Sequence, residues 1–347
     1  MARAAPRHDY KPAENAVTDN AFSHTPVLLE AVIEALSPKS GKVYVDGTLG
    51  AGGYTKALLE SSDCIVVGID RDPYAISYNK VLSERYPDRL HLICGHFGNM
   101  NAHLSTCGLS EVDGVALDLG VSSLQIDNPD RGFAFSQDGP LDMRMSQSGE
   151  TASEIVNSLE QDDLADLIYK YGEERLSKRI ARAIVSARKN EPIVTTSRLA
   201  EIIRSVAGSQ NRSRRNKLNR IDPATRTFQA LRIKINDEIN ELQLGLNEAE
   251  KVIKPGGRLA IVSFHSLEDR KVKVFLRQRS GNDHKGSRHR PDPKEVKEPT
   301  WRLLKKRAIQ PTEAEISVNP RARSARLRIA ERTSAPSWSS LSQEGQK

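Results

Sequence analysis

The chain has 347 residues, of which 37% are hydrophobic and 28% are charged, and its formal net charge is +7. No apolar run approaches the roughly 20 residues that cross a bilayer, and residues 1–21 lack the apolar core of a secretory signal, so we expect a cytoplasmic protein. The excess of positive charge favours a polyanionic partner without establishing one.

The cysteines Cys64, Cys94 and Cys107 stand far apart in the chain. They form neither the even-numbered framework of a disulfide-rich secreted protein nor the close pairs of a zinc site. We therefore expect reduced cysteines and no metal site.

Residues 24–119 alternate β-branched apolar runs with helical patterns, which predicts βαβ units and a mainly parallel sheet. A helix is expected over residues 24–36, where apolar residues recur at helical spacing. The expected strands cover residues 42–46, 64–70, 90–94 and 114–119.

The pattern changes after about residue 125. Residues 127–148 predict a long ordered loop, and a helical block follows, with helices expected over 173–189 and 196–206. Thr151 and Glu154 have the spacing of a capping box, and Gly172 and Pro192 are expected to break helices.

The α/β pattern resumes with a long helix expected over 225–253, a turn at 254–257 and a strand over 258–264. The last strands are expected at 308–312 and 325–330. A sheet that is interrupted and then resumed indicates an inserted helical domain. The predicted division is a flexible tail (1–22), a discontinuous α/β domain (23–125 and 222–332), a loop with an inserted helical substrate-recognition domain (126–221), and a second flexible tail (333–347). Residues 281–299 are also expected to be mobile.

A glycine-rich turn follows the first expected strand, at residues 45–53. Glycines allow the backbone to approach a ligand closely, although a tight turn alone would use the same residues. The spacing of a dinucleotide-binding turn would put Thr55 at its third glycine, which disfavours NAD. Asp46, Gly50 and Gly52 instead match the first motif of S-adenosylmethionine-dependent methyltransferases, with Thr48 replacing its first glycine.

Polar or aromatic residues follow the next three strands. Asp70 closes the second strand, where a carboxylate can accept both ribose hydroxyls of an adenosine or simply lie in a solvated turn. Phe97 follows the third strand and can stack on adenine or belong to the core. Asp118 ends the fourth strand. Because ligands of open α/β sheets bind at the carboxyl ends of the strands, these side chains predict a binding site there.

Several further motifs together resemble the ribosomal RNA small subunit methyltransferase H family, also called the MraW family, over residues 24–332. They are HTPVLL at 24–29, DGT at 46–48, DLGVSS at 118–123, RGFAF at 131–135, DGPLDMR at 138–144, YGEER at 171–175, PATRTFQA at 223–230, SFHSLEDR at 263–270 and NPRARS at 319–324. The resemblance implies a class I methyltransferase, a Rossmann-like α/β sheet with an inserted all-helical domain. It also implies methylation of the N4 amino group of one cytidine in the decoding region of 16S rRNA, in the small ribosomal subunit, with no obligate protein partner.

By resemblance, the residues that bind S-adenosylmethionine are Gly52, Gly53, Tyr54, Asp70, Phe97, Asp118 and Gln125. Tyr54 stands where relatives often have histidine, so only its backbone contact carries over. Asp118 can serve the cofactor, the target amine or both. His265, just after the fifth strand, is a second catalytic candidate, with a structural hydrogen-bonding role as the alternative.

The candidates for RNA binding are Arg131, Arg144 and Arg226. Arg131 and Arg144 can hold phosphates on a closing loop, or they can staple that loop in place. Two tracts also carry the excess charge: residues 204–220 hold six basic and no acidic residues, and residues 270–307 hold fourteen basic against four acidic. Two other readings stay open, a DNA or protein methyltransferase and a catalytically silent RNA-binding assembly factor.

Overall fold

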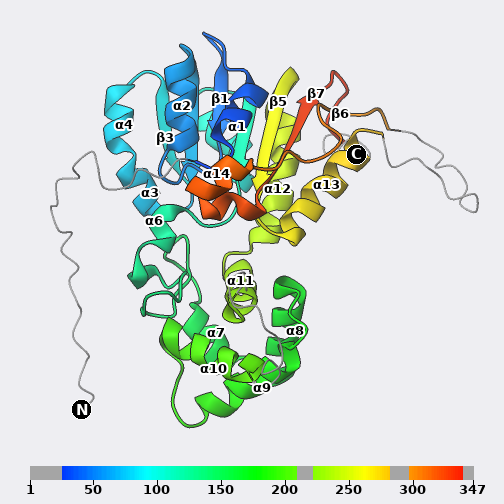
Figure 1. Cartoon of the computed structure of the whole chain (residues 1–347). Coiled ribbons are helices and arrows are strands. Elements are labelled where there is room, and N and C mark those ends of the chain that lie inside the picture. Colours follow the sequence, from blue (N-terminus) through cyan, green and yellow to red (C-terminus); the bar gives the residue numbers. More distant parts are fainter. Residues whose placement is uncertain (1–25, 209–221, 282–296, 339–347) are drawn as a thin grey trace, which may run out of the picture.

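A computed structural model of the chain describes residues 26–208, 222–281 and 297–338. It has two bodies, a β-sheet covered by helices and a smaller helical body beneath the lower ends of the strands as drawn (Figure 1). Within the described residues, no helix has the length and apolar character needed to cross a membrane. The predicted N-terminal tail lies outside the described residues, as do residues 209–221, 282–296 and 339–347 of the other polar segments.

The sheet has seven strands in the order β3-β2-β1-β4-β5-β7-β6. The strands β1 to β5 run parallel to one another, whereas β7 is antiparallel to both of its neighbours, β5 and β6. The strands are β1 (Val43–Asp46), β2 (Ile65–Asp70), β3 (Leu90–Cys94), β4 (Val112–Asp118), β5 (Ile253–Ser263), β6 (Trp301–Leu303) and β7 (Arg326–Arg332). The predicted Rossmann-like α/β sheet, interrupted by an all-helical segment, is confirmed.

Both faces of the sheet are buried because alternate residues of a strand point to opposite faces. In β1, Val43 and Val45 join one apolar cluster, and Tyr44 joins the cluster on the other face. The first face is covered by α5 (Met100–Thr106), α12 (Glu238–Val252) and α13 (Ser266–Arg279), and the second by α1 (Leu29–Leu36) and α2 (Gly53–Ser61). The short helices α3 (Pro73–Tyr78) and α4 (Lys80–Arg85) connect β2 to β3.

The helical body is formed by residues between β4 and α12. It begins with α6 (Ser123–Ile126), η2 (Pro129–Arg131) and a long loop, and continues with α7 (Ala152–Ser158), α8 (Gln161–Gly172), α9 (Ser177–Arg188) and α10 (Thr196–Gly208). The capping box of Thr151 and Glu154 is confirmed, and α8 ends at Gly172 as predicted. This body has an apolar core of its own, which includes Leu164, Ile168 and Ile184.

The expected single helix over 225–253 is wrong. Two helices, α11 (Ala224–Ile235) and α12, are separated where Asp237 adopts the left-handed conformation, with φ of 48°. Asn236 holds this break, because its Nδ2 donates to the carbonyl oxygen of Met143 at 2.8 Å. Phe228 and Leu231 of α11 belong to the core of the helical body. The predicted domain boundary at residue 222 therefore falls one helix too early, and the packing changes at Asn236.

The C-terminal strands also differ from the prediction. Residues 308–312 are not a strand and make one isolated bridge, between Ile309 and Leu327, whereas β6 lies earlier. Trp301 of β6 is buried in the core, an apolar anchor that lies within the basic tract. The turn at 254–257 lies inside β5 as an irregularity of its pairing with β4. The predicted C-terminal tail (333–347) begins too early. Ser337 still packs on the sheet body, because its Oγ donates to the buried carboxylate of Glu250 at 3.2 Å.

Candidate active site

The glycine-rich turn between β1 and α2 is shaped for close approach of a ligand. Gly50 and Gly52 have φ of 50° and 79°, which glycine adopts without a steric penalty. A Cβ atom at Gly52 would lie 2.0 Å from Asn79 Oδ1, and Asn79 Nδ2 donates to the Gly50 carbonyl oxygen at 2.9 Å. The turn is thereby fixed from behind, and a side chain at Gly52 has no room.

Asp46 fixes the other end of this turn. It is buried, and its carboxylate accepts hydrogen bonds from Thr55 Oγ1 at 2.8 Å and from the Thr55 amide at 3.2 Å. Burial raises its pKa to about 6, against which the hydrogen bonds from Thr55 and Thr48 act. Thr48, which replaces the first glycine of the common motif, accepts the Asp118 amide hydrogen on its hydroxyl at 2.6 Å. It therefore ties the glycine-rich turn to the end of β4.

Asp70, at the end of β2, faces the same turn. One carboxylate oxygen accepts from the Gly50 amide and the other from the Asp72 amide, both at 2.8 Å. The pKa of Asp70 is raised to about 6, mainly by burial and to a smaller extent by the carboxylates of Asp72 and Asp46, while the hydrogen bonds from the Asp72 and Gly50 amides act against this shift. The structure thus brings two of the predicted acidic residues to one edge of the sheet.

Asp118 ends β4 at that edge and has no partner for one of its oxygens. Its Oδ1 is buried and accepts no hydrogen bond from the described residues. Burial raises the pKa of Asp118 well above its ordinary value, and the carboxylates of Asp46 and Glu268 raise it further. Burying a hydrogen-bond acceptor without a donor costs free energy in a folded protein. The unpaired oxygen therefore indicates that a ligand supplies the donor.

Phe97 lies in η1 (Phe97–Asn99), next to the same turn. Its ring packs on α12, since a Cβ at Gly245 would lie 2.3 Å from Phe97 Cδ2. A Cβ at Gly47 would lie 3.2 Å from Phe97 Cβ. The ring is therefore half-buried beside the glycine-rich turn, in a position where it can contact a planar ligand.

Gln125 and Tyr54 use their side chains within the protein. Gln125 is buried, accepts the Ser122 amide hydrogen at 3.1 Å and donates to Asp72 Oδ2 at 2.9 Å. The hydroxyl of Tyr54 donates to the Val27 carbonyl oxygen at 2.5 Å, so its ring faces the core. Both side chains shape the walls of the site.

His265 is the N-cap residue of α13. Its Nδ1 accepts the Glu268 amide hydrogen at 3.4 Å, which is a structural role. Its Nε2 lies 3.0 Å from Glu268 Oε1, without the alignment of a hydrogen bond. The spacing of His265 and Glu268 is that of a capping box, so this structural role is signalled by the sequence.

Behind His265 lies a buried charge cluster that was not predicted. One possible metal-ligand atom from each of Glu238, His265 and Glu268 lies within 4.8 Å of the others, close enough to hold a metal ion. Both oxygens of Glu238 are taken by Arg232, at 2.8 and 2.9 Å. Because this guanidinium already supplies the positive charge, we do not assign the cluster to a metal.

The three arginines predicted to bind RNA differ in exposure. Arg131 is nearly buried and bonds Asp72 as well as the carbonyl oxygens of Arg144 and Met145. Its geometry favours the staple over the phosphate contact. Arg144 pairs with Asp142 at 2.7 Å and is one-quarter exposed. Arg226 is half-exposed and lies 3.9 Å from an oxygen of Glu174, just after α8.

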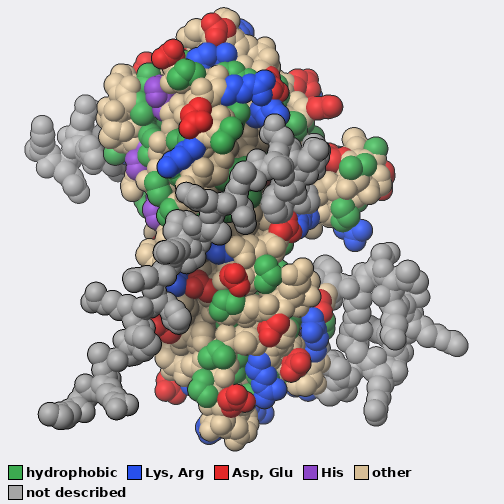
Figure 2. Space-filling model, turned by 90° about the vertical axis from the view of Figure 1, so that its left-hand side faces the viewer, with side chains coloured by type: hydrophobic (Ala, Val, Ile, Leu, Met, Phe, Trp, Pro, Cys, Tyr) green, Lys and Arg blue, Asp and Glu red, His purple; other side chains and the backbone are tan. Residues whose placement is uncertain are grey.

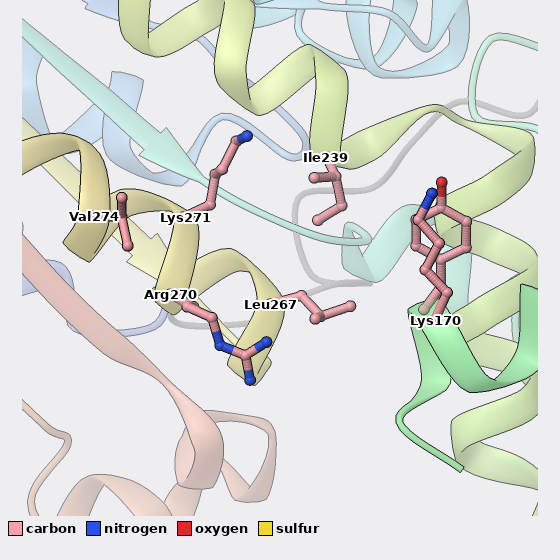
Figure 3. Close-up of a pocket in the computed structure, with 7 residues that line it drawn as sticks. Lys170, Ile239, Leu267, Arg270, Lys271 and Val274 are labelled. Carbon is pink, nitrogen blue, oxygen red and sulfur yellow. The ribbon is translucent and has the colours of Figure 1, made fainter.

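A separate pocket of about 280 Å³ lies where α8 approaches α12 and α13. Figure 3 shows Lys170 on one side, and Arg270 and Lys271 on the other, around an apolar floor that includes Leu267. None of the residues predicted to bind the cofactor lines it. On the face shown in Figure 2, acidic and basic side chains of the described residues intermingle on both bodies without a large patch of one sign.

The chain is similar to known proteins over most of its length. The model of the MraW methylase family matches residues 21–333. Ribosomal RNA small subunit methyltransferase H of Rhodospirillum centenum is 54% identical over 325 residues, which cover 94% of this chain and 96% of that protein. The protein of the same name from Paramagnetospirillum magneticum is 51% identical over 320 residues, 92% of this chain and 98% of its own length. A solved rRNA methylase from Streptococcus thermophilus has a TM-score of 0.37 and 11% identity, over 88% of this chain and 93% of that chain, a likeness too distant to say more about the site.

Proposed function

The chain belongs to the MraW methylase family, and from this membership we propose that it methylates the N4 amino group of one cytidine in the decoding region of 16S rRNA. The methyl donor of the family is S-adenosylmethionine. The proposed substrate is the rRNA within the small ribosomal subunit, in the cytoplasm. The relatives that are 54% and 51% identical to this chain are named as methyltransferases of small-subunit rRNA. The N4 position on cytidine is our proposal.

The observation that carries the proposal is the acidic edge of the sheet. Asp46, Asp70 and Asp118 lie at the carboxyl ends of three parallel strands, and burial raises the pKa of each. S-adenosylmethionine carries a positive sulfonium and a positive ammonium group, so it supplies the charge that this edge lacks. The glycine-rich turn is packed tightly against Asn79, because a Cβ at Gly52 would meet that side chain.

In the proposed site, Gly52, Gly53 and the backbone of Tyr54 line one side of the cofactor, and Asp70 accepts its ribose hydroxyls. Phe97 contacts the adenine, and Gln125 holds the wall through Asp72. When bound, the cofactor supplies an electrophilic methyl group next to the end of β4. The division of the chain is part of the proposal: the sheet binds the cofactor, and the helical body recognises the substrate.

Asp118 is the residue that we assign to the target amine. The N4 lone pair of cytosine is delocalised into the ring, so the enzyme must hold N4 in line with the methyl group and accept its hydrogen bonds. The two oxygens of Asp118 can contact the cofactor and the amine together. Because its pKa is raised, this carboxylate is a better proton acceptor than an exposed aspartate when N4 loses a proton.

The test is mass spectrometry of small-subunit rRNA nucleosides from cells with and without this gene. We expect N4-methylcytidine to disappear from one site in the deficient cells and to return when purified protein and S-adenosylmethionine are added to their subunits. Methyl transfer to DNA or protein fractions and not to rRNA would favour one of the other methyltransferases. Unchanged rRNA together with intact RNA binding would favour a silent assembly factor.

A further inference from the structure

A polar pocket of about 350 Å³ lies beside the proposed active site, where β5 passes into α13. Its lining includes His265 and Ser266 from that junction, Gln310, and Arg323, Ser324 and Arg326 from the end of η3 (Pro320–Ser324) and the start of β7. We call it the η3–β7 pocket. It contains part of the NPRARS motif, which the proposed function does not use.

The pocket lies close to Asp118. Asp118 pairs with Val262 in the sheet, and the Leu119 amide donates to the Val262 carbonyl oxygen at 2.9 Å. Phe264, which also lines the pocket, directly follows β5 and is two residues after Val262, roughly 7 Å by the rise of a strand. A Cβ at Gly120 would lie 3.8 Å from Phe264 Cδ2. The pocket therefore adjoins the loop that follows Asp118, within the reach of one nucleotide.

The charge of the lining is positive. Arg323 is exposed and makes no hydrogen bond or ion pair with the described residues. Arg326 is half-exposed and lies 3.2 Å from Asp269, but Asp269 also pairs with Arg328 at 2.7 Å, so its charge is shared. Among the described residues that line the pocket, none is acidic. The pocket thus presents two guanidinium groups to one volume.

His265 adds an imidazole to the lining. Its side chain is nine-tenths buried, and its Nε2 lies 3.0 Å from Glu268 Oε1, so that carboxylate already faces it. The Ser324 hydroxyl and the Gln310 amide are further hydrogen-bonding groups in the lining. Guanidinium groups together with hydroxyl and amide donors are the groups that bind phosphate in proteins.

We propose that the η3–β7 pocket binds a phosphodiester group of the RNA strand next to the target cytidine, with Arg323 as its main ligand. The inference rests on the proposed function, because the neighbouring active site decides which polyanion reaches the pocket. A phosphate held here fixes the strand on the side of β5, so that the target base can enter beside Asp118. Arg323 is a positioning residue in this scheme.

The test uses Arg323→Ala, Arg323→Lys and the matched control Arg85→Ala. Arg85 is also exposed, but it ends α4 just before β3 begins and so lies at the opposite edge of the sheet. Binding of each full-length variant to small subunits from gene-deficient cells is measured over a series of salt concentrations, with S-adenosylhomocysteine present. Methyl transfer and the Kd for S-adenosylmethionine are measured alongside.

We expect Arg323→Ala to weaken subunit binding by about tenfold and to reduce the slope of log affinity against log salt by about one. KM for the subunit rises accordingly, the Kd for S-adenosylmethionine is unchanged, and Arg323→Lys restores most of the affinity. If Arg323→Ala matches wild type or Arg85→Ala in subunit affinity and in the salt slope, the inference is overturned and the proposed function is unaffected. A wild-type protein that binds S-adenosylmethionine and leaves the subunits unmethylated overturns the proposed function, and the inference with it.

Discussion

Arg131 Nη1 lies 2.7 Å from Asp72 Oδ2, in a nearly buried contact that joins the loop after β4 to the turn after β2. Asp72 also accepts from Gln125, and Arg131 also donates to two carbonyl oxygens of its own loop. This pair therefore holds the loop against the wall of the proposed cofactor site.

Arg131→Ala should destabilise the protein, because it leaves the buried carboxylate of Asp72 without its charge partner. We expect the free energy of unfolding in urea to fall by about 3 to 5 kcal/mol, the usual cost of breaking a buried ion pair. The matched control is Arg144→Ala, whose pair with Asp142 is one-quarter exposed and should cost about 1 kcal/mol or less. Wild-type stability of Arg131→Ala, with a loss confined to RNA affinity, would instead identify Arg131 as a phosphate ligand.

The affinity for S-adenosylmethionine should depend on pH through the acidic edge. The pKa of both Asp46 and Asp70 is about 6, so each carboxylate is largely protonated below that pH and ionised above it. Because the cofactor is cationic, its Kd should fall as pH rises from 5 to 7, by up to about tenfold per pH unit for each carboxylate that must ionise.

Isothermal titration calorimetry at several pH values between 5 and 8 measures this dependence. Asp70→Asn should bind more weakly at pH 7 and show a shallower profile, whereas Glu111→Gln, at an exposed position, should follow wild type. A flat wild-type profile between pH 5 and 7 would mean that these carboxylates do not set the affinity.

Much of the sheet and its edge was predictable, because the signals are local. The spacing of Asp46, Gly50 and Gly52 and the β-branched runs each specify a strand or turn within a few residues, and the first four strands end within one residue of their predicted ends. The cofactor class followed from the same spacing.

The rest could not be predicted because it depends on contacts between distant segments. The break between α11 and α12 rests on Asn236, whose side chain bonds a backbone carbonyl of the loop after β4. The apolar spacing of that stretch continues across the break and favours one helix. In the same way, Arg232 and Glu238 meet His265 and Glu268 only in the folded chain, so the sequence does not reveal this cluster.

Asp118→Asn should separate the stability of the site from its activity. In the folded protein the pKa of Asp118 is raised, so the carboxyl group stabilises the fold only while protonated, and this contribution is lost as pH rises above its ordinary value of 3.8. Asparagine has no such ionisation. We therefore expect the ligand-free variant to be as stable as wild type at low pH and relatively more stable as pH rises.

The same substitution should lower kcat for methyl transfer by roughly 100-fold or more, the usual cost of losing one transition-state hydrogen-bonding group. Urea unfolding across pH and a methyl-transfer assay on deficient subunits give the two readouts. Wild-type kcat in Asp118→Asn would remove Asp118 from the chemistry and leave it with the cofactor alone.

Gly52→Ala should weaken cofactor binding for a steric reason, and the same substitution at Gly108 serves as the matched control. Gly52 and Gly108 have similar backbone conformations, with φ of 79° and 71°, so alanine is strained at both positions. At Gly108 nothing lies within 4 Å of the added Cβ, and we expect a loss of about 1 to 2 kcal/mol of stability with normal binding.

At Gly52 the Cβ would lie 2.0 Å from Asn79 Oδ1, so either the turn or Asn79 must move. Because Asn79 also bonds the Gly50 carbonyl oxygen, either movement distorts the turn that Asp70 holds through the Gly50 amide. We expect the Kd for S-adenosylmethionine to rise at least tenfold in Gly52→Ala and to stay unchanged in Gly108→Ala. Equal affinities in the two variants would place the cofactor away from this turn.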